Sequence, residues 1–163
     1  MSFSSSLSQI YIYLSVSILI GIVFNASRLD TLPLIAKPMA KVGNIDQISN
    51  NILDPIIREI ELEIAEILFE QNILFVDARS KEYYLEGHIP NSLCNDNLDS
   101  LVTNIEQHIL VDEAFVVYCS DDDCGSSEEL AFSLQEQGFS NIYLFKGGWK
   151  QWKDNNLPFE NNE

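Results

Sequence analysis

Residues 114–137 read AFVVYCSDDDCGSSEELAFSLQEQ, and this stretch decides the fold that we expect. The run at 114–118 is apolar throughout, which is typical of a strand buried on both faces of a parallel sheet. A helix follows it, with Ser126 or Ser127 as the expected N-cap. Cys119 therefore comes directly after a buried strand and shortly before a helix N-terminus.

Further helices and strands are predicted before and after this stretch in the sequence. The pattern predicts helices at 53–70, 80–86, 97–109 and from 147 onward, and strands at 73–76, 92–94 and 141–145. Helices that alternate with apolar strands at this spacing predict an α/β fold, with a parallel sheet covered by helices on both faces. Ligands of such sheets bind beyond the C-terminal ends of the strands, where we expect Cys119.

The N-terminal part of the chain predicts a transmembrane helix. Residues 7–26 carry no charge and have about the length that a spanning helix needs. A cleaved signal peptide is the first alternative, but no basic residue precedes Arg28 and no small-x-small cleavage site follows the apolar run. Burial in a soluble core is the second alternative, and it is disfavoured because both faces of the helix are apolar.

The expected organisation is an anchor at 1–26, a tether at 27–51 and an α/β domain at 52–163. Basic residues follow the predicted anchor and none precedes it; they are Arg28, Lys37 and Lys41. The positive-inside rule then predicts a single-pass protein of the cell membrane, with its α/β domain in the cytoplasm.

Composition excludes several classes of partner. The chain has 9 Lys and Arg against 25 Asp and Glu, a net charge of −16, so its surface repels the phosphates of nucleic acids. Its three cysteines form no CxxC pair, and its two histidines are not spaced as zinc ligands. We expect neither a metal site nor a cofactor.

Several segments together resemble the rhodanese-like domains, over about residues 60 to 159. The matching segments are ILFVDARSKEYYLEGHIPNS (73–92), AFVVYCS (114–120), LAFSLQEQGFSNIYLFKGGWKQW (130–152) and Leu157-Pro158. The resemblance implies sulfur transfer: a cysteine thiolate takes a sulfane sulfur from a donor and passes it to an acceptor. Donor and acceptor would be a small thiol or a protein persulfide, and a membrane protein is a further possible partner.

The resemblance also assigns roles to residues. The nucleophile would be Cys119, and the DxR element, Asp77 and Arg79, would be mainly structural. His88 would help to determine the fold rather than act as a base. The active-site loop would comprise Ser120, Asp121, Asp122, Asp123, Cys124, Gly125, Ser126 and Ser127, with backbone N–H groups and a helix N-terminus favouring the thiolate.

This loop departs from the family pattern. It is longer than usual and lacks the Arg or Lys that many members carry, so phosphatase chemistry, which needs an Arg, is not expected. Its aspartates oppose thiolate formation at Cys119 and repel a dianionic donor such as thiosulfate. A protein persulfide or a low-charge donor suits this loop better.

Cys124 leaves the function open. It lies within reach of Cys119, so it could resolve a persulfide, accept its sulfur, or simply pack at the base of the loop. Cys94 is expected to be a packed thiol. Three functions therefore remain: a sulfurtransferase using Cys119, a non-catalytic binding module, and a thiol–disulfide redox element built on Cys119 and Cys124.

Overall fold

The computed structural model describes residues 3–28, 40–42, 56–121 and 124–161 of the chain. The chain divides into two compact units, Met1–Pro38 and Met39–Glu163. Most of the predicted tether, and Asp122 and Asp123 of the predicted active-site loop, lie outside the described residues.

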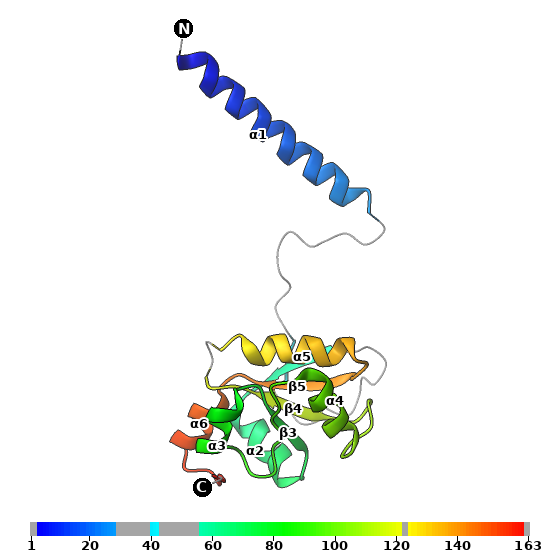
Figure 1. The fold of residues 1–163 in the computed structure, drawn as a ribbon, viewed down its shortest axis with the longest axis vertical. Coiled ribbons are helices and arrows are strands. Elements are labelled where there is room, and N and C mark those ends of the chain that lie inside the picture. The colour runs from blue at the N-terminus through cyan, green and yellow to red at the C-terminus, as the bar shows by residue number, and fades with distance from the viewer. Residues whose placement is uncertain (1–2, 29–39, 43–55, 122–123, 162–163) are drawn as a thin grey trace. The chain divides into compact units, whose positions relative to one another are not determined.

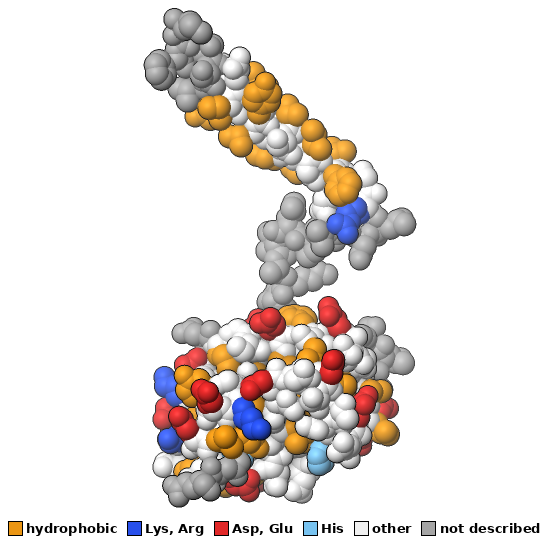
Figure 2. Space-filling view, in the orientation of Figure 1, with side chains coloured by type: hydrophobic (Ala, Val, Ile, Leu, Met, Phe, Trp, Pro, Cys, Tyr) orange, Lys and Arg blue, Asp and Glu red, His pale blue; other side chains and the backbone are white. Residues whose placement is uncertain are grey.

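Helix α1 (Phe3–Ala26) forms the first unit, as predicted for this stretch. Its segment Ser8–Ala26 has a mean hydropathy of 1.8, and among the described residues it is the one helix long and apolar enough to cross a membrane. Apolar side chains line the helix along the part that is drawn in colour in Figure 2. The hydroxyls of Ser15 and Ser27 donate to the carbonyls four residues earlier, at 2.8 Å and 2.7 Å, so neither needs water as a partner. Membrane anchors and signal sequences both contain helices of this kind.

The second unit is built on a parallel sheet (Figure 1). Its strands are β1 (Ala40–Val42), β2 (Ile56–Ile60), β3 (Leu74–Asp77), β4 (Phe115–Tyr118) and β5 (Asn141–Phe145). They lie in the order β1-β2-β5-β4-β3, and every pairing is parallel. The four longer strands form the body of the sheet, and the short β1 extends it beside β2. The parallel sheet predicted from the alternating pattern is confirmed.

Five helices accompany these strands within the described part of the unit. They are α2 (Leu62–Glu70), α3 (Lys81–Glu86), α4 (Leu98–Glu106), α5 (Ser126–Glu136) and α6 (Gly148–Asp154). The predicted helices at 80–86 and 97–109, and the predicted helix that opens at 147–148, are confirmed. The predicted strand at 92–94 is reduced to a single parallel bridge between Val76 and Leu93.

The apolar strand β4 supplies core residues to both faces of the sheet. Val116 and Tyr118 pack in one cluster with residues of α2 and with Trp152 of α6. Phe115 and Val117 point the other way and pack in a second cluster with residues of α4 and α5. Figure 1 shows α2 and α5 on opposite sides of the strands. Helices therefore cover both faces, which is why β4 is apolar at every position.

The predicted helix at 53–70 is wrong over residues 56–61, and its residues 53–55 lie outside the described residues. Residues 56–60 form β2, which pairs with β5 along its whole length, and only Leu62–Glu70 is helical. Ile57 packs in the α4/α5 cluster and Ile60 in the α2/α6 cluster. Residues three positions apart in a strand point to opposite faces of the sheet, so this arrangement is typical of a strand covered on both faces. The isoleucines at 56, 57 and 60 fit both helical and strand spacing, and pairing with β5 decides between them.

The predicted cap of α5 is also wrong. Its N-cap is Gly125, and Ser126 is already the first helical residue. The Ser127 hydroxyl donates to the Cys124 carbonyl at 3.4 Å, so this side chain binds the loop before the helix. The C-terminal end agrees with expectation, because Gly138 adopts a φ of 103° just after the helix.

Candidate functional site

Cys119 is the residue that follows β4 at the C-terminal edge of the sheet, and it is only 3% exposed. The start of α6 fixes its backbone. The Trp149 N–H donates to the Cys119 carbonyl and the Lys150 N–H donates to the Ser120 carbonyl, both at 2.8 Å. Gly148 allows this approach: its φ is 56°, and a side chain there would overlap the Cys119 carbonyl. The first two residues of the loop are thus held rigidly against α6.

A disulfide joins Cys119 to Cys124 and closes the loop on itself. The two Cα atoms are 6.1 Å apart, an ordinary separation for a disulfide. The Cys124 N–H also donates to the Asp121 carbonyl at 3.2 Å. Cys124 is partly exposed, whereas Cys119 is buried. The structure therefore brings the two cysteines singled out in the sequence into direct contact.

The other residues of the predicted loop differ in exposure. Ser120, Gly125 and Ser126 are exposed, Asp121 is partly exposed, and Ser127 is buried. The expected convergence of backbone N–H groups on the Cys119 sulfur rests partly on Asp122 and Asp123, so it stays a prediction. Helix α5 does begin at Ser126, two residues after Cys124.

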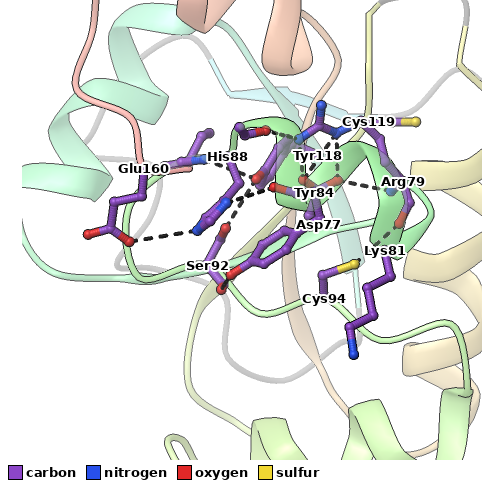
Figure 3. A network of polar contacts seen from close by, with 12 residues as sticks. Asp77, Arg79, Lys81, Tyr84, His88, Ser92, Cys94, Tyr118, Cys119 and Glu160 are labelled. Carbon is purple, nitrogen blue, oxygen red and sulfur yellow. Dashed lines mark hydrogen bonds and ion pairs between the residues drawn. The ribbon is translucent and has the colours of Figure 1, made fainter. Parts of the chain in front are cut away.

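Asp77 and Arg79 form a buried ion pair beside the site (Figure 3). Arg79 Nε donates to both Asp77 oxygens at 3.0 Å and 3.1 Å, and Nη2 donates to Oδ2 at 2.6 Å. Nη2 also donates to the Gly87 carbonyl at 2.7 Å, and the guanidinium carbon lies 5.0 Å from the centre of the Trp149 ring. Burial alone lowers the pKa of Arg79, but the hydrogen bond and the charge of Asp77 outweigh it and raise that pKa. In Figure 3 the Cys119 sulfur points away from this pair. The arrangement agrees with a structural role for both residues.

His88 ties the C-terminal segment to the loop after α3. Its backbone exchanges two hydrogen bonds with Glu160, at 2.8 Å and 2.9 Å. Its Nδ1 lies 2.8 Å from the Tyr84 carbonyl and therefore carries the proton, because a carbonyl only accepts. The ring also stacks on Tyr84 at 3.7 Å, and Nε2 lies 3.7 Å from a Glu160 oxygen. These contacts fit the expected role of His88 in determining the fold.

Cys94 is a partly buried free thiol that donates to the Arg79 carbonyl at 3.3 Å (Figure 3). Burial, with the charges of Asp77 and Asp96, raises the pKa of Cys94 to about 12. A thiol with so high a pKa is almost entirely protonated at neutral pH and reacts poorly as a nucleophile. The predicted packed thiol agrees with this setting.

Lys146 is the residue at this edge that the sequence interpretation missed. Its ammonium lies 2.5 Å from a carboxylate oxygen of Glu128, in the first turn of α5, and 4.0 Å from a carboxylate oxygen of Glu59. Tyr118 pairs with Phe145 in the sheet, so Cys119 and Lys146 are the residues that directly follow two adjacent strands. The end of β5 thus brings a cation to the sheet edge at which Cys119 lies, whereas the loop after Cys119 carries none.

A polar cleft of about 290 Å³ lies at the same edge of the sheet, beside the start of α5. Its polar lining includes Ser80, Asn95, Asp96, Ser126, Glu129 and Ser133, together with Asp77 and Arg79. Neither Cys119 nor Cys124 lines this cleft.

Comparisons with known proteins agree with this geometry. A family model described as the rhodanese-like domain matches residues 62–155. The thiosulfate sulfurtransferase GlpE of Pseudomonas syringae pv. syringae (strain B728a) is 35% identical over 96 residues, which are 59% of this chain and 87% of that protein. GlpE of Coxiella burnetii (strain RSA 331 / Henzerling II) is 30% identical over 92 residues, 56% of this chain and 82% of that protein. Among solved structures, the BH2092 protein from Bacillus halodurans shares the fold. Its TM-score is 0.54 at 22% identity, and the match covers 64% of this chain and 77% of that one.

Proposed function

Because this chain belongs to the family of rhodanese-like domains, we propose that it is a sulfurtransferase that carries sulfane sulfur as a persulfide on Cys119. The observation that supports this most is the position of Cys119. It lies buried at the C-terminal end of the internal strand β4, in the loop that leads into α5. The relatives named as thiosulfate sulfurtransferases are similar to this chain over 56–59% of its length.

The proposed reaction has two steps at one sulfur atom. The Cys119 thiolate attacks the sulfane sulfur of a donor, the bond between that sulfur and the rest of the donor breaks, and the leaving group keeps the electron pair. The persulfide then gives its outer sulfur to an acceptor thiolate, which regenerates the Cys119 thiolate. The N-terminal end of α5 supplies positive potential near both anionic forms.

Donor choice follows from the charges around the loop. Asp121, Glu128 and Glu129 are acidic, and Lys146 is already paired with Glu128. A like charge about 4–6 Å from a dianionic donor costs on the order of 1–4 kcal/mol. The substrate in this proposal is therefore a protein persulfide or a low-charge persulfide, and thiosulfate is a poor donor.

The proposal places the enzyme at a membrane. The apolar helix α1 supports an anchor, with residues 7–26 in the lipid bilayer and the basic residues after it on the cytoplasmic side. The domain at 52–163 would then work in the cytoplasm, where donor and acceptor thiols stay reduced.

A transfer assay tests this proposal on the full chain purified in detergent. Sulfane sulfur is offered as cysteine persulfide or as thiosulfate, at low and high ionic strength, and its removal from the donor is followed. We expect fast removal from cysteine persulfide and slow removal from thiosulfate, which high salt partly relieves. Cys119→Ser should abolish removal and Cys94→Ser should not. Full activity in Cys119→Ser would overturn the proposal, and fast, salt-independent use of thiosulfate would overturn the charge argument.

The disulfide favours a second candidate, a thiol–disulfide redox element built on Cys119 and Cys124. A purely redox element would oxidise and reduce this pair without taking sulfur from any persulfide. A non-catalytic binding module would do neither. The assay therefore separates the sulfurtransferase from the other two functions, and a reversible loss of two hydrogens from the chain that requires both Cys119 and Cys124 separates the redox element from the binding module.

A further inference from the structure

We propose that Cys124 resolves the Cys119 persulfide, so that this enzyme releases sulfide and is left with the Cys119–Cys124 disulfide. The inference rests on the proposed function, since it needs the persulfide on Cys119. It adds the fate of the persulfide, which is cleaved by a thiol of the same loop, and the product, which is inorganic sulfide.

The geometry of the loop selects the inner sulfur as the target. In the structure the Cys124 sulfur is bonded to the Cys119 sulfur itself, the atom that becomes the inner sulfur of a persulfide. Strand β4 before the loop and helix α5 after it are both formed in this state. Cys124 therefore reaches the inner sulfur within the folded domain. Attack there expels the outer sulfur, whereas attack on the outer sulfur would only move it to Cys124.

Exposure favours the internal thiol over an external one. Cys119 is only 3% exposed, and its carbonyl and that of Ser120 are held by α6. An acceptor from solution has to approach this buried sulfur, while Cys124 is already part of the same loop. A correctly placed internal thiol reacts far faster than a free thiol that must first lose its translational freedom.

The step balances without an added oxidant. The Cys124 thiolate attacks Cys119 Sγ and a new Sγ–Sγ bond forms. The persulfide reacts in its protonated form, with the proton on the outer sulfur. The bond between Cys119 Sγ and the outer sulfur breaks, and this sulfur leaves as HS⁻ with the electron pair and its proton. The sulfane sulfur is reduced to sulfide, and the two cysteines are oxidised to a disulfide.

Each turnover then needs a reductant, and the structure indicates where it reacts. A dithiol of the thioredoxin-like class would attack the Cys124 sulfur, because Cys124 is the more exposed partner of the disulfide. The Cys119 thiolate leaves first, and the second thiol of the reductant then frees Cys124. Both cysteines return to the reduced state with the reductant oxidised.

Cys94 provides a matched control for this role. It is a cysteine of the same domain, but it donates to the Arg79 carbonyl, and burial raises its pKa to about 12. It contacts neither partner of the disulfide in the described structure. The Cys94→Ser substitution removes one thiol from the chain but leaves both cysteines of the proposed reaction in place.

The test is a single turnover on the fully reduced full chain, in detergent and without oxygen. One equivalent of cysteine persulfide is added, and free sulfide and intact mass are measured on wild type, Cys124→Ser and Cys94→Ser. Wild type and Cys94→Ser should release about one sulfide per chain and lose two hydrogens, and dithiothreitol should restore both thiols. Cys124→Ser should keep one extra sulfur and release at least about tenfold less sulfide.

The outcomes separate this inference from the proposed function. If wild type holds the extra sulfur as stably as Cys124→Ser does, Cys124 does not resolve the persulfide, and sulfur transfer by Cys119 still stands. If Cys124→Ser takes up no sulfur at all, the persulfide is not formed, and the proposed function fails together with the inference.

Discussion

Replacing Gly148 by alanine should destabilise the α/β domain through its contact with the Cys119 backbone. Gly148 has a φ of 56°, and forcing a residue with a side chain into this region costs about 1–2 kcal/mol. The new Cβ would overlap the Cys119 carbonyl oxygen and lie 3.1 Å from the Ser120 carbonyl carbon, so the loop has to move. That movement weakens two backbone hydrogen bonds of 2.8 Å, worth about 0.5–1.5 kcal/mol each. We expect a total loss of about 2–4 kcal/mol.

Gly138→Ala is the matched control for this variant. Gly138 also has a positive φ, 103°, but nothing lies within 4 Å of a Cβ at this position. It should therefore lose only the backbone cost, about 1–2 kcal/mol. The difference between the two variants isolates the contact between Gly148 and the loop that carries Cys119.

Urea unfolding of the full chain in detergent measures both losses. The chain has two tryptophans, Trp149 and Trp152, and both lie in α6, so fluorescence reports on the α/β domain alone. All proteins are kept in the same redox state. If Gly148→Ala loses no more stability than Gly138→Ala, the contact between the start of α6 and the backbone of Cys119 and Ser120 does not stabilise the domain.

Further variants and one pH series test the surroundings of the site. Arg79→Ala leaves the buried Asp77 carboxylate without its partner and should cost about 3–5 kcal/mol of unfolding free energy in the same urea assay; a loss below about 1 kcal/mol would contradict a structural ion pair. Burial raises the pKa of Cys94 to about 12. In a chain with Cys119→Ser and Cys124→Ser, the rate of Cys94 alkylation should therefore still rise about tenfold per pH unit beyond pH 9. A rate that levels off near pH 9 would show an ordinary thiol. Lys146→Gln removes the cation paired with Glu128. It should slow sulfur uptake from thiosulfate several-fold, which corresponds to about 1 kcal/mol or less of activation free energy, and change uptake from cysteine persulfide little. Equal slowing with both donors would rule out a charge effect.

Local sequence was enough to predict the part of the fold around Cys119. The apolar run of β4 is buried on both faces of the sheet, and no helical period competes with it. The same holds for β5, whose predicted bounds at 141–145 agree with the structure. These elements place Cys119 at the C-terminal edge of the sheet, which follows from the alternation of strands and helices alone.

Two errors arose where the local signal fitted two structures. Ile57 and Ile60 fit a helical stripe, but they also fit opposite faces of a strand, and pairing with β5 settles the choice. Ser126 is a good N-cap by type, but the loop turns at Gly125 instead. In both cases backbone contacts determine the local structure, and they override the intrinsic secondary-structure preference of the residues.

The site contains features that only the assembled fold reveals. Lys146 is 27 residues from Cys119 in sequence, and only the pairing of Tyr118 with Phe145 brings it near. The rule that parallel strands end at the same edge could have suggested Lys146 beforehand. The loop sequence left three roles open for Cys124, and its contact with the inner sulfur of the proposed persulfide favours one of them.

The most direct test of sulfur transfer at Cys119 is to locate the transferred sulfur on the chain. The full-length Cys124→Ser variant is treated with cysteine persulfide, digested and analysed by tandem mass spectrometry under conditions that preserve persulfides. The account predicts one extra sulfur on the peptide that contains Cys119, none on the peptide that contains Cys94, and removal of that sulfur by dithiothreitol. An unmodified Cys119, or an extra sulfur found on Cys94 instead, would contradict it.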